Sequence, residues 1–351
     1  MKDLFTPYEL MDLKLKNRVV MPPMCQYSVN NKDGIATDWH YMHYVSRAIG
    51  GAGLIIIEMT DVEPDGRISD FDLGIWSDEQ IHALARIVEG CHAYGAKVGI
   101  QIAHAGRKAE DAAVPVAPSA IPFDANSNTP RELTTAEVKA MIEKFRQGVA
   151  RAVKAGVDVI ELHGAHGYLI HQFHSPLTNH RTDEYGQDLT LFGREVILAA
   201  KSEMPAGMPL IVRISAKEYV EGGYGISGSL EFSKAYKEAG ADIFHVSTGG
   251  EGPIGVGPIA TTSEKPGSHA AYQVPLARAI KESLHVPVIA VGRLDEPALA
   301  DAVIGNEEAD LVAIGRGMLR NPYWALEAAV QLHKEADIPK PYKFGFPRTI
   351  K

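Results

Sequence analysis

Two histidines and a tyrosine are the first residues in this sequence whose types and spacing suggest chemistry. His163, His166 and Tyr168 directly follow a short apolar run. Two imidazoles at the end of a strand can donate hydrogen bonds to one substrate oxygen, and a tyrosine, which is protonated at neutral pH, can supply a proton. The cluster therefore predicts an electrophilic clamp with a general acid. The alternatives are a structural histidine pair and a metal site that also uses His171 and His174. We expect no metal, because no carboxylate or thiolate lies at ligand spacing among the four histidines.

Glycine followed by arginine ends the last two apolar runs of the chain. These pairs are Gly292 with Arg293 and Gly315 with Arg316. Glycines there, followed by the start of a helix, expose backbone N–H groups that bind phosphate, and the arginines can add charge-assisted hydrogen bonds. The pattern predicts a phosphate site. The alternative is that the glycines only turn the chain and the arginines are solvated.

Eight short runs rich in valine and isoleucine are predicted as buried strands, because they are too short for helices. Stretches with helical periodicity separate them. The clearest extends from Thr134 to Ala155 and starts with a capping-box pattern of Thr134 and Glu137. Eight alternations of strand and helix predict a closed parallel (β/α)8 barrel, the TIM barrel. The runs are Arg18 to Met21, Leu54 to Met59, Lys97 to Ile102, Val157 to Leu162, Pro209 to Ile214, Asp242 to Val246, Pro287 to Val291 and Asp310 to Ile314.

The chain is predicted to be one domain. The barrel occupies residues 1–335, with an N-terminal hairpin over roughly residues 1–17, and a C-terminal tail follows over residues 336–351. In such barrels the active site lies at the C-terminal ends of the strands, so the residues that follow each run are the candidates. Besides those named above, they are Pro22, Pro23, Met24, Cys25, Tyr27, Met59, Gln101, Arg213 and Ser247.

Composition excludes several classes of function. The 351 residues contain 35 Lys and Arg against 44 Asp and Glu, a net charge of −9. This balance argues against nucleic acid or an anionic membrane as a partner, because both need a clustered basic field. Two cysteines, Cys25 and Cys91, cannot build a disulfide framework or hold an iron–sulfur cluster. With no apolar export segment or membrane span in the sequence, we expect a cytoplasmic protein.

A glycine-rich motif, G-x-G-x-x-G over residues 250–255, follows the sixth run. A dinucleotide-binding turn needs a helix after the glycines and an acidic residue about twenty positions later, and both are missing here. We predict a mobile loop at this place.

These motifs together resemble the old yellow enzyme family, and the cysteine-containing block that follows the first apolar run, Pro22 to Tyr27, resembles its "thermophilic-like" subgroup of bacterial ene-reductases. The similarity extends from about Leu4 to Leu332. The blocks that carry it are Pro22 to Tyr27, Gln101 with His104 to Lys108, His163 to Leu169, Ser175 to Gly186, and Gly315 with Arg316.

The resemblance implies an FMN-dependent NAD(P)H oxidoreductase that reduces activated C=C bonds, such as those of enones, nitroalkenes and maleimides. It further implies a ping-pong cycle with hydride transfer from flavin N5, in which NADPH or NADH is the reductant. A homodimer or homotetramer is expected.

The same resemblance implies a role for each site residue. The flavin phosphate is expected at Gly315 and Arg316 with the backbone of Gly292 and Arg293. His163 and His166 are expected to bind the carbonyl or nitro oxygen of the substrate, Tyr168 to protonate the carbon α to it, and Tyr27 to touch the ligand. The other cofactor-binding residues are expected to be Pro22, Pro23, Met24, Cys25, Met59, Gln101 and Ser247, and Arg213 at the N1/C2 edge of the ring. The alternative for Arg213 is a barrel-interior arginine paired with a neighbouring carboxylate, and the alternative for Gln101 is a polar strand cap.

The chain departs from the family at several places. Met59 replaces a residue that is usually small in the subgroup, and residues 187–194 depart from the family's usual pattern. In the tail, Arg348 is a candidate for the arginine that in this subgroup enters the site of a neighbouring subunit. Two other functions are weighed: a flavin-binding redox sensor in which Cys25 responds to oxidant, and a flavin-free lyase for phosphorylated substrates that uses Lys108 as a Schiff base.

Overall fold

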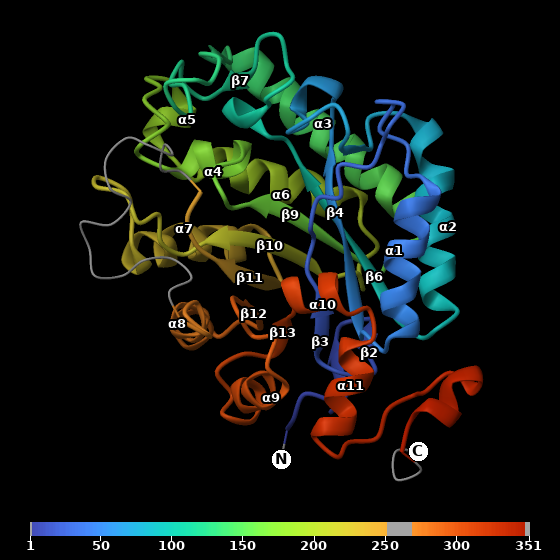
Figure 1. The fold of residues 1–351 in the computed structure, drawn as a ribbon. Helices are drawn as coiled ribbons and strands as arrows, with labels where there is room; N and C mark the ends of the chain where they lie inside the picture. The colour runs from blue at the N-terminus through green and yellow to red at the C-terminus, as the bar shows by residue number, and fades with distance from the viewer. Residues whose placement is uncertain (1, 251–268, 348–351) are drawn as a thin grey trace.

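The computed structural model describes residues 2–250 and 269–347, and at its centre eight parallel strands form a closed ring (Figure 1). The last strand pairs with the first, which closes the ring. Each predicted apolar run overlaps one strand, so the TIM barrel prediction is confirmed. The strands are β3 (Val19–Met21), β4 (Leu54–Asp61), β6 (Lys97–Ala103), β9 (Val159–Gly164), β10 (Leu210–Ser215), β11 (Ile243–Ser247), β12 (Val288–Val291) and β13 (Leu311–Ala313).

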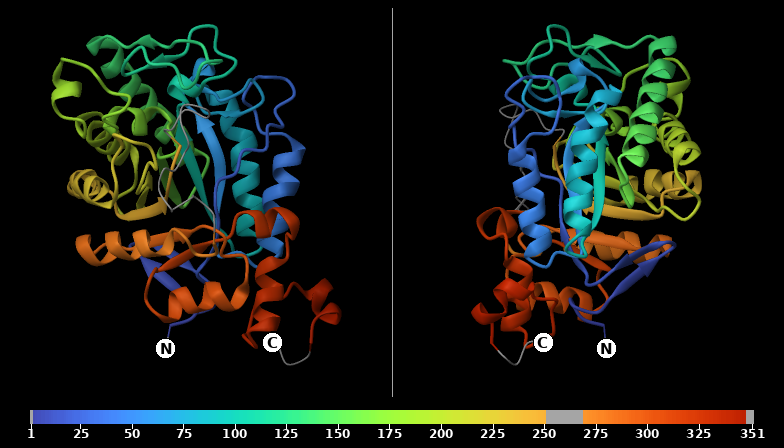
Figure 2. Two further views of the ribbon diagram at one scale, coloured as in Figure 1. Left: turned by 60° about the vertical axis from the view of Figure 1, so that its left-hand side comes forward. Right: turned by 90° about the vertical axis from the view of Figure 1, so that its right-hand side faces the viewer.

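Helices cover the outside of the ring, as the views in Figure 2 show. The predicted capping box at the start of α3 is confirmed: the Glu137 amide donates to Thr134 Oγ1 at 3.2 Å, and the Thr134 amide donates to a Glu137 carboxylate oxygen at 2.8 Å. The longer helices are α1 (Asp38–Ile49), α2 (Ile81–His92), α3 (Thr135–Lys154), α6 (Leu191–Glu203), α7 (Ile226–Ala239), α8 (Val274–Leu284), α9 (Pro297–Gly305) and α11 (Trp324–Gln331).

Strand residues divide between two apolar layers, because successive side chains of a strand point to opposite faces. One layer lies between the ring and the helices. The other fills the inside of the ring and includes Val20, Leu54, Ile56, Val159, Ile211, Ile243, Ile289 and Leu311. Two positions further along β9, β10 and β11, the inward residues are Glu161, Arg213 and His245. The inside of the barrel therefore changes from apolar to polar toward its C-terminal end.

Short elements follow the C-terminal ends of the strands and form the rim of the barrel at that end (Figure 1). After β6 the chain makes a long excursion before α3 begins. The rim elements are η1 (Pro64–Gly66), β5 (Leu73–Gly74), η2 (Asp78–Gln80), η3 (Gly106–Lys108), β7 (Val116–Ala117), β8 (Arg131–Glu132), α4 (Leu169–His174), α5 (Glu184–Gln187) and α10 (Arg316–Arg320).

An N-terminal hairpin of β1 (Tyr8–Leu10) and β2 (Leu13–Leu15) closes the opposite end of the barrel. Tyr8, Leu13 and Leu15 pack against the inner apolar layer. Water is thereby excluded from the bottom of the barrel, and the polar rim is the end that is left for a ligand.

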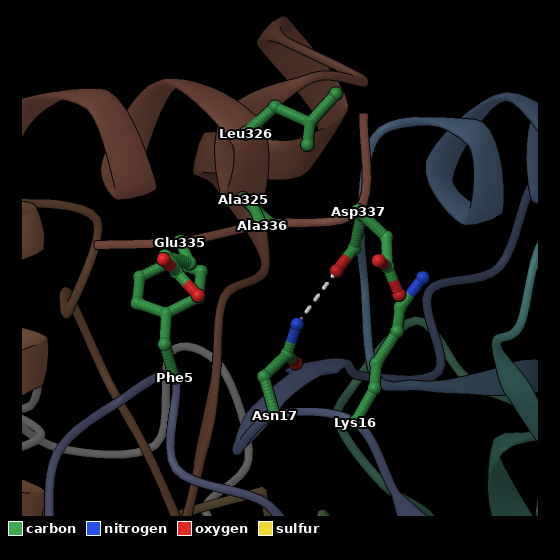
Figure 3. Close-up of a pocket in the computed structure, with 9 residues that line it drawn as sticks. Phe5, Lys16, Asn17, Ala325, Leu326, Glu335, Ala336 and Asp337 are labelled. Atoms are coloured by element: carbon green, nitrogen blue, oxygen red, sulfur yellow. Dashed lines mark hydrogen bonds between the residues drawn. The ribbon is translucent and has the colours of Figure 1, made fainter. Parts of the chain in front are cut away.

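A cavity of about 210 Å³ lies at the N-terminal end of the barrel strands (Figure 3). Phe5, Lys16 and Asn17 line it together with residues of α11 and residues 335–337. Asn17, which precedes β3, donates from Nδ2 to the carbonyl of Gly51, which precedes β4, at 2.8 Å. Active sites of such barrels lie at the C-terminal ends of the strands, so a cavity at the opposite end is not the expected active site.

Beyond α11 the tail turns away from the barrel into η4 (Lys340–Gly345) (Figure 2). Phe344 in this turn is fully exposed. Arg348 lies outside the described residues. Within residues 2–250 and 269–347, no helix has the length and apolar character needed to cross a membrane.

Candidate active site

The histidine and tyrosine cluster predicted from the sequence comes together at the C-terminal end of β9. The ring of His163 lies 5.1 Å from that of His166 and 4.8 Å from that of Tyr168, centroid to centroid, and meets both edge-on. His166 has a left-handed backbone, with φ of 61°, and Tyr168 is the N-cap residue of α4. The sharp turn between strand and helix thus brings the rings of His166 and Tyr168 against the ring of His163 at the end of β9.

The two histidines are neutral. Burial lowers the pKa of His163 and of His166 well below the usual value, and the nearby Arg213 guanidinium lowers both further. The Ala165 amide donates to His163 Nδ1 at 3.3 Å, so the proton of this ring is on Nε2. His163 therefore offers an N–H donor without carrying a charge.

The tyrosine also keeps its proton, because burial raises the pKa of Tyr168 well above 10. Its ring lies 4.9 Å from Lys108 Nζ, which donates to the His166 carbonyl at 2.9 Å. His166 Nε2 lies 2.8 Å from Ser247 Oγ, and when the hydroxyl donates to this nitrogen the neutral ring carries its proton on Nδ1, free for a ligand. The cluster can therefore supply hydrogen-bond donors and one proton to a bound oxygen or carbon.

A cavity of about 210 Å³ lies near the ends of β12 and β13, where the phosphate site was predicted. Nine predicted cofactor-binding residues line it: Pro22, Pro23, Met24, Arg213, Ser247, Gly292, Arg293, Gly315 and Arg316. Sequence reasoning missed two residues of the strands that line it, Val291 and Ala313, and four residues outside the strands: Tyr272, Gln273, Leu294 and Asp295. A search only of the residues directly after each strand does not reach these four.

The phosphate part of this cavity is suited to an anion. Helix α10 begins at Arg316 with Gly315 as its N-cap, so the first N–H groups of the helix are available to a ligand. Gly292 has φ of 123°, and a Cβ there would lie 2.8 Å from Gln273 Nε2, so only glycine fits between the strand end and this amide. With Arg293 and Arg316 in the wall, the cavity presents backbone donors and two positive charges.

Two buried polar side chains beside this cavity, Arg213 and Gln101, are suited to bind a heterocyclic ring. Arg213 is buried, and its Nε has no hydrogen-bond partner among the described residues. Gln101 donates from Nε2 to Glu161 Oε1 at 2.7 Å, which leaves its own carbonyl oxygen to accept. An amide acceptor and a cationic donor match the N–H and carbonyl groups at the pyrimidine edge of a flavin. The residues present therefore fit FMN.

An apolar wall completes the site beside Tyr168. Met59 packs with Ile68 and Ala103, and Cys25 and Tyr168 lie against this cluster. A bulge in β4 between Ile57 and Met59 shifts the register by one residue, so that Met59 pairs with Gln101. Burial raises the pKa of the Cys25 thiol well above the usual value.

Three other predictions concern this region. Tyr27 is half-exposed, with a left-handed φ of 50°, and its hydroxyl interacts with the Cys25 side chain. Of the predicted mobile loop at residues 250–255, residues 251–255 lie outside the described part of the chain. The further histidines have other partners: His171 Nε2 lies 3.0 Å from Glu218, and His174 Nδ1 lies 2.9 Å from the Tyr236 hydroxyl. In residues 2–250 and 269–347, no three His, Cys, Asp or Glu side chains are grouped as metal ligands.

Comparison with known proteins assigns the family. Residues 3–335 match the family described as "NADH:flavin oxidoreductase / NADH oxidase". The chain is 48% identical over 344 residues to the NADPH dehydrogenase of Listeria monocytogenes serotype 4a, covering 97% of this chain and 98% of that one. Morphinone reductase in complex with tetrahydroNAD superimposes with a TM-score of 0.79 at 27% identity, over 98% of this chain and 94% of that chain.

A third similarity is to the fold alone. A 2-naphthoyl-CoA reductase superimposes with a TM-score of 0.84 at 23% identity, over 95% of this chain, which spans about half (52%) of that protein. The match over residues 3–335 and the full-length relatives lead to one conclusion: the chain belongs to the NADH:flavin oxidoreductase family of old yellow enzyme type, and it is an oxidoreductase that uses FMN and a reduced nicotinamide nucleotide.

Proposed function

We propose that this protein is an ene-reductase that uses NADPH to reduce C=C bonds activated by a carbonyl or nitro group. The observation that carries the proposal is the cluster of His163, His166 and Tyr168 in neutral, proton-bearing states. The relatives named NADPH dehydrogenase and the structural similarity to morphinone reductase support the same class of reaction.

The two histidines bind the activating oxygen of the substrate. Negative charge develops on this oxygen as hydride reaches the alkene, and a preorganised donor is worth about 2.7–4 kcal/mol in the transition state. Neutral rings suit the task, because the desolvated site next to Arg213 disfavours a further positive charge. His163 donates from Nε2, and His166 is held in place by Ser247.

Tyr168 gives its proton to the carbon α to the activating group. The hydroxyl is protonated over the whole physiological range, and its ring lies against that of His163. The clamp and the acid therefore act on the same substrate, one on its oxygen and the other on its carbon. Tyr27 contacts the ligand from the exposed side of the site.

FMN, when bound, supplies two-electron hydride chemistry at N5 between the nicotinamide and the alkene. Arg293 and Arg316, with the backbone at Gly292 and Gly315, hold its phosphate. Gln101 and Arg213 bind the pyrimidine edge of the ring. Pro22, Pro23, Met24, Cys25, Met59 and Ser247 form the remaining contacts in this proposal.

The two other functions weighed from the sequence are disfavoured by particular residues. A redox sensor needs a reactive thiolate, whereas burial keeps Cys25 as a thiol. A Schiff-base lyase needs an available amine, whereas Lys108 donates to the carbonyls of His166 and Gly250, at 2.9 and 3.4 Å. Membership of an oxidoreductase family also disfavours the lyase.

The direct test uses the absorption spectrum of the purified protein. We expect a flavin spectrum, bleaching by NADPH without oxygen, and recovery on addition of cyclohexenone. The double substitution His163→Ala and His166→Ala should abolish phenol binding while FMN stays bound. Enone turnover at the wild-type rate by this variant would refute the clamp, and a colourless protein that cannot be reconstituted with FMN would refute the function.

We also propose a cytoplasmic homodimer or homotetramer in which the tail lies at the subunit interface. Phe344 is fully exposed and Tyr342, two residues before it, is also exposed, so the tail presents neighbouring aromatic side chains that a partner subunit would cover. The mass in solution, measured by light scattering for the full chain and for a chain that ends at residue 335, tests this. A monomeric full chain would contradict it.

A further inference from the structure

Three buried side chains from three different strands form a hydrogen-bonded network inside the barrel. Gln101 of β6 donates from Nε2 to Glu161 Oε1 at 2.7 Å, and His245 Nδ1 lies 2.8 Å from Glu161 Oε2. Gln101 is 2% exposed, and Glu161 and His245 are completely buried. Sequence reasoning gave a role to Gln101 but none to Glu161 or His245.

Both oxygens of Glu161 act as acceptors in this network. The amide nitrogen of Gln101 has only protons to offer, so its orientation is fixed and its carbonyl oxygen points away from Glu161. An ionised carboxylate has no proton to give, so the ring of His245 carries its proton on Nδ1. One carboxylate therefore sets an amide orientation and a histidine tautomer.

Arg213 lies next to this carboxylate on the same inner face of the barrel. In the strand register Arg213 pairs with His163 on one side and with His245 on the other, and Glu161 lies two residues before His163. Arg213 Nε and His245 Nε2 are buried and have no hydrogen-bond partner among residues 2–250 and 269–347. Burial lowers the pKa of Arg213, and Glu161 is the strongest neighbouring influence that raises it.

We propose that Glu161 is a positioning residue and a buried counter-ion that lowers the reduction potential of the bound FMN. It holds the Gln101 amide in one orientation, and it offsets part of the positive charge of Arg213. The proposal rests on the proposed function, because it takes Arg213 and Gln101 to lie at the pyrimidine edge of the ring.

The sign of the effect follows from charge. Uptake of two electrons and one proton, delivered as hydride from the nicotinamide, adds one negative charge to the isoalloxazine. Arg213 stabilises that charge and raises the potential, whereas Glu161 opposes it and lowers the potential. Because the site is buried, the opposing influence is weakly screened. A lower potential favours the step in which hydride passes on to the alkene.

The test measures the FMN potential of the holoenzyme by equilibration with a reference dye. Glu161→Gln keeps an acceptor for Gln101 but removes the charge, so we expect the ratio of reduced to oxidised flavin at a fixed potential to rise at least tenfold, which is about 30 mV for a two-electron couple. Glu161→Asp keeps the charge and should stay within about threefold of the wild type in this ratio, while it binds FMN more weakly because the shorter side chain releases Gln101.

A matched control makes the same substitution in a second buried glutamate–histidine pair. Glu218 lies 3.0 Å from His171 Nε2 and accepts from the Tyr224 amide at 2.8 Å. Glu218→Gln should leave the potential unchanged. An unchanged or lowered potential in Glu161→Gln, or an equal rise in Glu218→Gln, would overturn the proposal.

A second readout does not depend on turnover. In wild-type protein labelled with ¹⁵N-histidine, we expect the His245 ring to be protonated on Nδ1 only, with its resonance assigned by loss in His245→Gln. Protonation on Nε2, or on both nitrogens, would overturn the network. These outcomes differ from a failure of the proposed function, which would appear as a wild-type protein that binds FMN but does not reduce enones.

Discussion

Tyr168 is a residue whose surroundings define its task, because burial prevents it from ionising and its ring lies 4.8 Å from that of His163. For Tyr168→Phe we expect alkene reduction to slow about 10²–10⁴-fold, the usual contribution of a general acid. Flavin reduction by NADPH should change little, since that step does not use the proton. Anaerobic stopped-flow measurement of the two half-reactions separates these effects.

The control for this substitution is Tyr94→Phe, which removes the hydroxyl of a surface tyrosine that is 43% exposed. It should leave both half-reactions unchanged. An alkene half-reaction at the wild-type rate in Tyr168→Phe would show that water, rather than this tyrosine, supplies the proton.

At the residue scale, the sequence predicted the members of the site that are close together in the chain. His163 lies near the end of β9, and His166 and Tyr168 follow within five residues, so their spacing alone indicates that they share a site. Glu161 could not be recognised, because in an apolar run it looks like an ordinary strand residue. Its two partners, Gln101 and His245, come from other strands, and only closure of the barrel brings them together.

At the scale of elements, the turns that follow three of the strands give the site its shape. Tyr27, His166 and Arg293 have left-handed backbones, with φ of 50°, 61° and 52°, and they follow β3, β9 and β12. A residue other than glycine loses roughly 1–2 kcal/mol in this conformation. The rest of the fold must offset that cost, and the site gains side chains with fixed directions.

Gly292 offers a test of the turn after β12. Alanine there would combine a φ of 123° with a Cβ 2.8 Å from Gln273 Nε2, which donates to the Val291 carbonyl. We expect Gly292→Ala to weaken FMN binding at least about tenfold, which corresponds to the loss of roughly 1.4 kcal/mol. Titration of the apoprotein with FMN, followed by flavin fluorescence, measures the change.

Gly305→Ala serves as the comparison, because this glycine ends α9 and an added Cβ meets its nearest neighbour, the Lys2 carbonyl oxygen, at 3.9 Å. FMN affinity should be unaltered in this variant. Equal affinities in the two variants would indicate that the phosphate lies elsewhere on the rim.

The regular elements were predictable, and the irregular ones were not. Valine-rich runs and the capping box at Thr134 carry their own local signal, so strands and helices were found within a few residues. The bulge at Glu58 depends on tertiary contacts: its carboxylate accepts from the Tyr44 hydroxyl at 2.6 Å and from the Gln26 amide at 2.8 Å. Without that bulge Met59 would not pair with Gln101, and no local pattern reveals it.

For the whole molecule, Asp61 predicts how stability depends on pH. Its carboxyl group is completely buried, and neither oxygen has a hydrogen-bond partner among the described residues. Burial raises the pKa of Asp61 well above 3.8, so the folded protein keeps a proton that the unfolded chain loses. The contribution to stability is complete below the unfolded pKa and is lost as the pH rises through the folded pKa, with a slope of about 1.4 kcal/mol per pH unit in between.

Asp61→Asn removes this titration while the shape of the side chain is kept. We therefore expect the difference in the free energy of unfolding, variant minus wild type, to increase from pH 5 to pH 8. Urea unfolding at saturating FMN, repeated at several pH values in this range, gives the free energy of unfolding as a function of pH for the variant and for the wild type. Parallel curves would mean that Asp61 is ionised in the folded protein or exposed to water.

The overall architecture was the most predictable level, because a count of eight alternating strands and helices admits few arrangements. The sequence did not reveal that the inside of the barrel is apolar at one end and polar at the other. The hairpin residues Leu13 and Leu15 seal one end with apolar side chains, and Glu161, Arg213 and His245 make the other end polar. Both facts depend on which residues share an inner layer, and the register of the closed ring decides that.

The pairing of the first barrel strand, β3, with the last, β13, has a consequence for synthesis of the protein in the cell. A nascent chain still on the ribosome lacks the partner for one edge of β3 until Leu311 to Ala313 have emerged from the exit tunnel. Gly315 and Arg316, at the phosphate end of the cavity, appear later still. Capture of the vitamin-derived cofactor is therefore expected only after both edges of the ring have left the tunnel, late in biogenesis of the polypeptide.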